Sequence, residues 1–196
     1  MNFLENLGKE DLRRATHHAS VGNEEFYKLA LIGDAVLNLY LVLKFYERRS
    51  LEEIYSLISE YKSNKALYLA VEDLNLKGLL VADPNHISDY IYASMLEAIT
   101  GLIYQRFGLD GAFKFLDEVF PILERRRANF RNYWEELRKR EKGKVKVSFH
   151  PENGEFVAEI ELRDGTFIGK GRSKKEARNE AAKKALTREH PYNTHL

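Results

Sequence analysis

Two acidic residues in the first part of the chain stand where carboxylates are costly and could support metal-dependent chemistry. Asp34 interrupts the apolar run LALIGDAVLNLYLVLKF, where an unpaired buried carboxylate needs a compensating partner. Glu97 has small neighbours at helical spacing, which leave room for an ion or a partner group. They are Ala93, Ser94 and Gly101. Because Mg²⁺ prefers oxygen ligands, the pair predicts a divalent-cation site. The structural alternatives are a helix cap for Asp34 and a buried ion pair or hydrogen bond for Glu97.

Basic residues gather at the start of a helix near the other end of the chain. Ser173 is followed three residues later by Glu176, a capping-box pattern that begins a helix. Lys174, Lys175 and Arg178 project from its first turns. A helix N-terminus has free N–H groups and a positive end, so it attracts phosphate. The pattern favours a polyanion site, and the alternative is that these charges only keep the helix soluble.

The elements that must position the two carboxylates are predicted to be helices. The segment 26–48 is apolar on every side, which is typical of a helix in the middle of a bundle. A helix over 88–107 carries Glu97, and Gly108 closes it. Further helices are predicted over 52–75 and 110–120, and an Arg-rich stretch, 124–131, follows Pro121.

The spacing of apolar residues changes after residue 140. Residues 144–149 and 156–162 alternate between apolar and polar, as half-buried strands do, with a turn over 150–154 between them. Asp164-Gly165 is a hairpin turn before a third strand over 166–169. Helices are expected over 132–140 and over KKEARNEAAKKAL, whose alanine stripe can pack closely on a sheet. This order predicts one antiparallel sheet with both helices on one face.

Composition and charge exclude several classes of protein. The chain has 196 residues, 44% of them hydrophobic, which excludes wholesale disorder. It has no cysteine, which excludes disulfides, a catalytic thiol and thiolate metal sites. Residues 1–121 hold 12 Lys+Arg and 18 Asp+Glu (−6), whereas residues 122–196 hold 19 and 12 (+7), so the second part is suited to a polyanion. Without a recognisable signal peptide or membrane span, we expect a cytoplasmic protein with no membrane partner.

The segment GKGRSKKEARNEAAKKAL, residues 169–186, closely resembles the C-terminal signature of the double-stranded-RNA-binding domain. The resemblance implies that Lys174, Lys175 and Arg178 contact the phosphates of duplex RNA between two minor grooves. It also places Glu135 at a minor-groove contact. His150 falls in the loop that usually supplies a second such contact, although this loop, HPENG, is short and its residue order is changed.

Four earlier segments resemble, in order, parts of the ribonuclease III catalytic domain. They are LRRATHHAS (12–20), LALIGDAVL (29–37), SNKAL (63–67) and EAITGLIY (97–104). The resemblance implies an all-helical domain that pairs as a homodimer, in which each of two active sites cuts one strand of the duplex. The family uses four carboxylates. Two of their positions are Ala30 and Ser94 here, each about one helical turn before Asp34 or Glu97.

Two functions are compatible with this reduced set of acids. In the first, Mg²⁺, or Mn²⁺ in its place, is bound by the catalytic residues Asp34 and Glu97, and hydrolysis leaves a 5′-phosphate and a 3′-hydroxyl. The motifs L-A-x-x-G-D-A and Y-x-Y-x-x-x-x-E resemble those of the mini-ribonuclease III branch, which shares the loss. In the second, the chain is an inactive RNA-binding subunit of a ribosomal or RNA-processing complex. We predict the nuclease because both acids are retained.

The expected organisation is multidomain. An all-α ribonuclease III-like domain over 1–122 is followed by a basic linker over 123–131. An α+β (α-β-β-β-α) double-stranded-RNA-binding domain over 132–190 comes next, with a tail over 191–196. Duplex RNA is the expected partner, and RNA processing, including that of ribosomal RNA, is the expected role.

Overall fold

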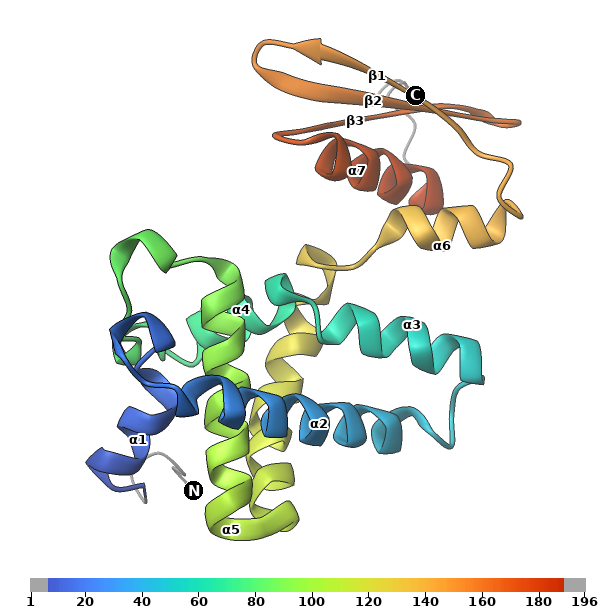
Figure 1. The fold of residues 1–196 in the computed structure, drawn as a ribbon. Coiled ribbons are helices and arrows are strands. Elements are labelled where there is room, and N and C mark those ends of the chain that lie inside the picture. The colour runs from blue at the N-terminus through green and yellow to red at the C-terminus, as the bar shows by residue number, and fades with distance from the viewer. Residues whose placement is uncertain (1–6, 189–196) are drawn as a thin grey trace. The chain divides into compact units, whose positions relative to one another are not determined.

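The computed structural model describes residues 7–188, which form two compact units that divide between Arg131 and Asn132 (Figure 1). In the described part of the first, helical unit, the regular elements are α-helices and short 3₁₀ helices. They are α1 (Lys9–Thr16), η2 (Ala19–Val21), α2 (Glu25–Phe45), α3 (Leu51–Tyr61), α4 (Asn64–Asp73), η3 (Lys77–Leu79), η4 (Pro84–His86), α5 (Asp89–Arg126) and η5 (Arg127–Asn129). The second, sheet unit contains α6 (Tyr133–Arg140), β1 (Lys146–Glu152), β2 (Glu155–Leu162), β3 (Gly165–Gly171) and α7 (Lys174–Thr187). The predicted fold class is confirmed, and the predicted tail lies outside the described residues.

The centre of the helical unit is a close crossing of α2 and α5 (Figure 1). A Cβ atom on Gly33 of α2 would collide with the carbonyl oxygen of Glu97 on α5, and one on Gly101 would collide with the carbonyl oxygen of Leu29. A glycine inside a helix costs roughly 1 kcal/mol relative to alanine, and here backbone contact requires it at both positions. The crossing therefore brings the residue after Gly33, Asp34, next to α5.

One face of α2 is buried in the core and the opposite face is exposed. The buried residues include Phe26, Leu29 and Leu41, whereas Leu31 is 72% exposed and Tyr46 is 70% exposed. The predicted position in the middle of the bundle thus holds for the face of α2 that crosses α5, whereas the opposite apolar face has no neighbour among the described residues. By length and composition alone, α2 is also apolar enough to cross a membrane, as buried core helices often are.

Helix α5 is interrupted at Gly108, as predicted, and then turns back along the unit (Figure 1). Gly108 adopts φ 67° and ψ −168°, a conformation that glycine tolerates. The second half was predicted to end before Pro121, but it continues to Arg126 because Val119 and Leu123 are buried on either side of the proline. The segment 123–131 is consequently part of the helical unit, and its prediction as a linker was wrong.

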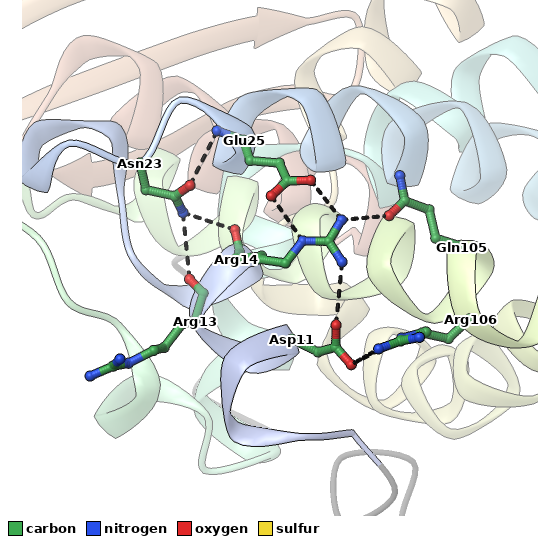
Figure 2. Close-up of polar contacts among 7 residues, drawn as sticks. All are labelled: Asp11, Arg13, Arg14, Asn23, Glu25, Gln105 and Arg106. Atoms are coloured by element: carbon green, nitrogen blue, oxygen red, sulfur yellow. Dashed lines mark hydrogen bonds and ion pairs between the residues drawn. The ribbon is translucent and has the colours of Figure 1, made fainter.

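A polar cluster fastens α1 to α2 and α5 (Figure 2). The guanidinium of Arg14 donates to both carboxylate oxygens of Glu25, at 2.8 and 2.6 Å, and to the side-chain oxygen of Gln105 at 2.9 Å. Asp11 accepts from Arg14 at 3.3 Å and pairs with Arg106 on α5. Because these ion pairs and hydrogen bonds connect three helices, they hold the start of α2 in place relative to α5.

The sheet unit has three antiparallel strands in the order β1-β2-β3, with α6 and α7 on one face (Figure 1). Its core joins both helices to the sheet through Trp134, Leu137, Phe167 and the alanines of α7. Strand β1 continues through Glu152, so the turn predicted over 150–154 is reduced to Asn153 and Gly154. Both turn residues have positive φ, 51° and 81°, which a two-residue hairpin requires.

Candidate active site and duplex-binding surface

Asp34 lies in the middle of an unbroken helix. Because α2 runs from Glu25 to Phe45 without a break after Gly33, the alternative reading of Asp34 as a helix cap is excluded. Its side chain is 43% exposed, and its Oδ1 lies 2.7 Å from Nζ of Lys62. The compensation that an acid in an apolar run requires is thus supplied partly by solvent and partly by a lysine.

Glu97 lies on α5 opposite Asp34, at the point where its own carbonyl oxygen meets Gly33. Burial, the nearby negative charge of Asp34 and a hydrogen bond with Asp34 together raise the pKa of the Glu97 carboxyl to about 7, while Lys62 opposes the change. A carboxyl in this state is protonated in a substantial fraction of molecules at neutral pH. The two carboxyls therefore act on each other electrostatically, as the prediction of a shared site requires.

Lys62 is the residue of this site that sequence reasoning missed. Lys62 follows α3 directly. The next residue, Ser63, caps α4: its Oγ accepts from the N–H of Ala66 at 3.3 Å. The break between the two helices fixes the position of Lys62. Nζ of Lys62 also donates to Oδ1 of Asn38 at 3.4 Å. The sequence indicated that Asp34 needs a compensating partner, but only the packing of α3 against α2 shows that Lys62 is that partner.

The donor set suits a small hard cation with few protein ligands. Asp34, Glu97 and the amide oxygen of Asn38 provide oxygen atoms, and Mg²⁺ commonly uses only one or two carboxylates alongside water and phosphate. Among residues 7–188, no group of three or more His, Cys, Asp or Glu side chains is arranged to hold a metal. Ala30 and Ser94, at the positions of the other family acids, are both buried, with 5% and 3% exposure. The residues present thus fit one ion better than two.

The start of α7 keeps the expected lysines exposed. Oγ of Ser173 accepts from the N–H of Glu176 at 3.2 Å, and the Glu176 carboxylate accepts from the N–H of Arg172 at 2.9 Å, so the helix start is capped from both sides. Lys174 and Lys175 are exposed, and Nζ of Lys174 lies 5.7 Å from the Phe149 ring centre. This helix end presents two ammonium groups and its own positive pole.

The other three predicted contacts lie on different parts of the sheet unit. The guanidinium of Arg178 stacks 4.6 Å above the ring of Trp134, which holds it against α6. Glu135 lies on α6 and pairs with Arg138 at 3.4 Å. His150 is an exposed residue of β1 that faces Glu159 at 3.8 Å.

The placement of His150 in a loop was wrong. It lies within β1, and its neighbour Phe149 packs toward the α7 face of the sheet. Since successive strand residues point to opposite faces, His150 points to the face away from α7. The structure therefore brings Lys174 and Lys175 together but does not bring His150 to them.

Comparison with known proteins agrees with both units. The chain matches the Ribonuclease III domain over residues 27–108 and the Double-stranded RNA binding motif over residues 135–188. Ribonuclease 3 of Borreliella burgdorferi is 30% identical, with 94% of this chain and 89% of that protein covered. Ribonuclease 3 of Carboxydothermus hydrogenoformans is 29% identical, with 88% and 83% covered.

Solved structures agree with the fold of the helical unit. The nuclease domain of ribonuclease III from Campylobacter jejuni, described for flexibility in a region involved in dimer formation, matches with a TM-score of 0.53 at 21% identity. That match covers 57% of this chain and 85% of the other. With Asp34, Lys62 and Glu97 inside the first matched segment and α7 inside the second, this chain belongs to the ribonuclease III family.

Proposed function

We propose that this protein is a Mg²⁺-dependent endoribonuclease that hydrolyses the backbone of double-stranded RNA. The observation that carries the proposal is the pair Asp34 and Glu97, two interacting carboxyls at the crossing of α2 and α5, in a chain that also has a duplex-binding motif. Carboxyls with strongly perturbed pKa values gather at active sites, and the pKa of Glu97 is raised by burial and by Asp34. The inactive-subunit alternative has no such observation in its favour.

Two residues of the helical unit would have direct roles in hydrolysis. Asp34 and Glu97 would hold the cation, which when bound supplies a Lewis acid for water and for the developing phosphate charge. The pKa of Glu97 is raised in the absence of the cation, and a bound cation would favour its charged form, so cation binding and deprotonation of Glu97 are coupled. When water attacks phosphorus and the bond to the 3′-oxygen breaks, the phosphate stays on the 5′ side and the 3′-oxygen leaves as a hydroxyl.

The sheet unit would hold the substrate. Lys174 and Lys175 stand exposed at the positive end of α7, where they can contact phosphates without reading sequence. Arg178, stacked on Trp134, joins that helix to α6, which carries Glu135. Binding of this kind releases counterions and must weaken steeply as salt is raised.

A second copy of the chain is the proposed partner of the helical unit. The outward face of α2 exposes Leu31, Leu43 and Tyr46, at 72%, 55% and 70%. Large exposed apolar side chains along one helix and its C-cap favour an interaction surface rather than a face that stays in water. A homodimer would bring two sites to one duplex, one for each strand. We place this activity in cytoplasmic RNA processing.

The decisive experiment is cleavage of a long RNA duplex by the purified chain. The wild type is expected to cut with Mg²⁺ and with Mn²⁺, leaving 5′-phosphate and 3′-hydroxyl ends. Asp34→Asn is expected to lose at least about 100-fold in rate. The matched control is Asp117→Asn, which removes an exposed carboxylate on α5, 3.5 Å from Lys44, and should leave cleavage unchanged. Binding of duplex by the wild type without cleavage under every metal and pH condition would instead establish the inactive subunit.

A further inference from the structure

The ammonium of Lys62 lies beside the Asp34–Glu97 pair, next to Asp34. The Lys62 side chain is only 18% exposed, whereas the Asp34 side chain beside it is 43% exposed. An ammonium has three N–H donors, and among the described residues Nζ of Lys62 forms an ion pair with Oδ1 of Asp34 at 2.7 Å and donates to Oδ1 of Asn38 at 3.4 Å. The third donor remains for a group that arrives from solvent.

We propose that Lys62 is a catalytic residue that acts as a built-in cation: its ammonium takes the place of a second divalent ion and contacts a non-bridging oxygen of the phosphate under attack. This inference rests on the proposed hydrolysis at Asp34 and Glu97. It assigns a role to a residue that none of the recognised motifs contains.

The charges of the site favour one divalent ion together with this ammonium. Asp34 and Lys62 cancel each other, and Glu97 adds at most one negative charge. Two divalent ions would bring four positive charges to a group of side chains whose net charge is no lower than −1. In a partly buried site their repulsion is poorly screened and opposes the second ion. One ion and one ammonium supply positive charge to the phosphate with less repulsion.

The reaction needs no co-reactant beyond water in this arrangement. The water oxygen forms a bond to phosphorus as the bond from phosphorus to the 3′-oxygen breaks. The proton that water loses passes to solvent, and the 3′-oxygen takes a proton from solvent as it leaves. Negative charge on the non-bridging oxygens is greatest midway, and the third N–H of Lys62 would meet it there. In other enzymes, removal of one such positioned donor lowers the rate about 10²–10³-fold.

The test uses three variants of the full chain. Lys62→Met removes the charge at similar length, and Lys62→Arg keeps it. Lys44→Met is the matched control, because Lys44 also pairs with a carboxylate on another helix, Asp117 at 3.5 Å, but lies well along α2 from Asp34. Three quantities are measured: the single-turnover cleavage rate at saturating Mg²⁺, duplex affinity without divalent ions, and the number of Mn²⁺ ions bound per chain by electron spin resonance.

The expected result is a loss of about 100-fold or more in cleavage rate for Lys62→Met, with duplex affinity within about threefold of wild type. Lys62→Arg should retain more activity than Lys62→Met, and Lys44→Met should match wild type. The wild type should bind one Mn²⁺, and Lys62→Met should bind a second.

Undiminished cleavage by Lys62→Met would overturn the proposal. Equal Mn²⁺ stoichiometry in wild type and Lys62→Met would also overturn it, whether or not cleavage is detected. If the wild type bound duplex RNA but did not cleave it, the proposed function would fail, and the Mn²⁺ count would still decide whether Lys62 stands in for an ion.

Discussion

Replacing Glu97 by glutamine is expected to stabilise the metal-free protein at pH 8 and to leave its stability unchanged at pH 4. The pKa of Glu97 is about 7 in the folded chain, against an ordinary value of 4.5, because the carboxyl is buried beside Asp34. A raised carboxyl pKa means that folded-state stability is highest below pH 4.5 and is lost as the pH rises through about 7. Glutamine carries no charge at any pH, so it avoids the loss.

The magnitude follows from the size of the shift. A difference of roughly 2.5 pKa units corresponds to about 3 kcal/mol at pH 8, which is an upper limit because solvent reaches part of the site. For a chain of this size, that limit corresponds to a rise in melting temperature of about 6 to 12 °C. Bound Mg²⁺ would stabilise the charged carboxylate, so the advantage of Glu97→Gln should shrink when the ion is added.

The assay is thermal unfolding followed by circular dichroism at 222 nm, with EDTA, at pH 4, 6 and 8. Glu47→Gln, which changes an exposed glutamate at the end of α2, is the control and should show no such pH dependence. An equal effect of Glu97→Gln at all three pH values, or destabilisation at pH 8, would refute the reasoning that burial and Asp34 together disfavour the charged carboxylate.

Three further predictions concern other parts of the chain. Lys174→Ala combined with Lys175→Ala should weaken duplex binding and reduce the slope of log affinity against log salt by about 2, and an unchanged slope in a binding titration would remove the case for this helix end. Gly33→Ala should destabilise the chain by about 1–3 kcal/mol in urea unfolding, because its methyl group meets the facing carbonyl of α5, whereas Gly78→Ala meets open space and should be tolerated. Leu31→Glu should convert a dimer to a monomer in sedimentation analysis, and unchanged self-association would place the interface elsewhere.

The loss of two acids and the presence of Lys62 both make the site less negative. With Ala30 and Ser94 at buried positions beside the crossing, the site has less negative charge than four carboxylates would give. Lys62 then lowers the net negative charge further, 2.7 Å from Asp34. A site of this composition can bind a divalent ion less strongly and still present positive charge to a phosphate, which is what cleavage of a polyanion needs.

Local patterns in the sequence determined much of the fold. The alternation along 156–162 predicted β2, Ser173 marked the start of α7, and Gly108 marked the break in α5. Each of these features depends on residues adjacent in the chain: strand periodicity, a side-chain cap and a backbone angle that glycine allows. The acid pair was also proposed from the sequence, because burying a carboxylate in an apolar helix costs free energy unless a partner compensates it.

Only the tertiary structure decided the features that depend on distant partners. Core packing on both sides of Pro121 allows α5 to continue past the proline, so the predicted linker is part of the helical unit. An extended β1 turned His150 to the face away from α7, because one residue of register reverses a side chain. The sequence predicted a compensating partner for Asp34, and that partner became Lys62 only when α3 packed against α2, since many side chains could compensate the charge and only geometry selects one.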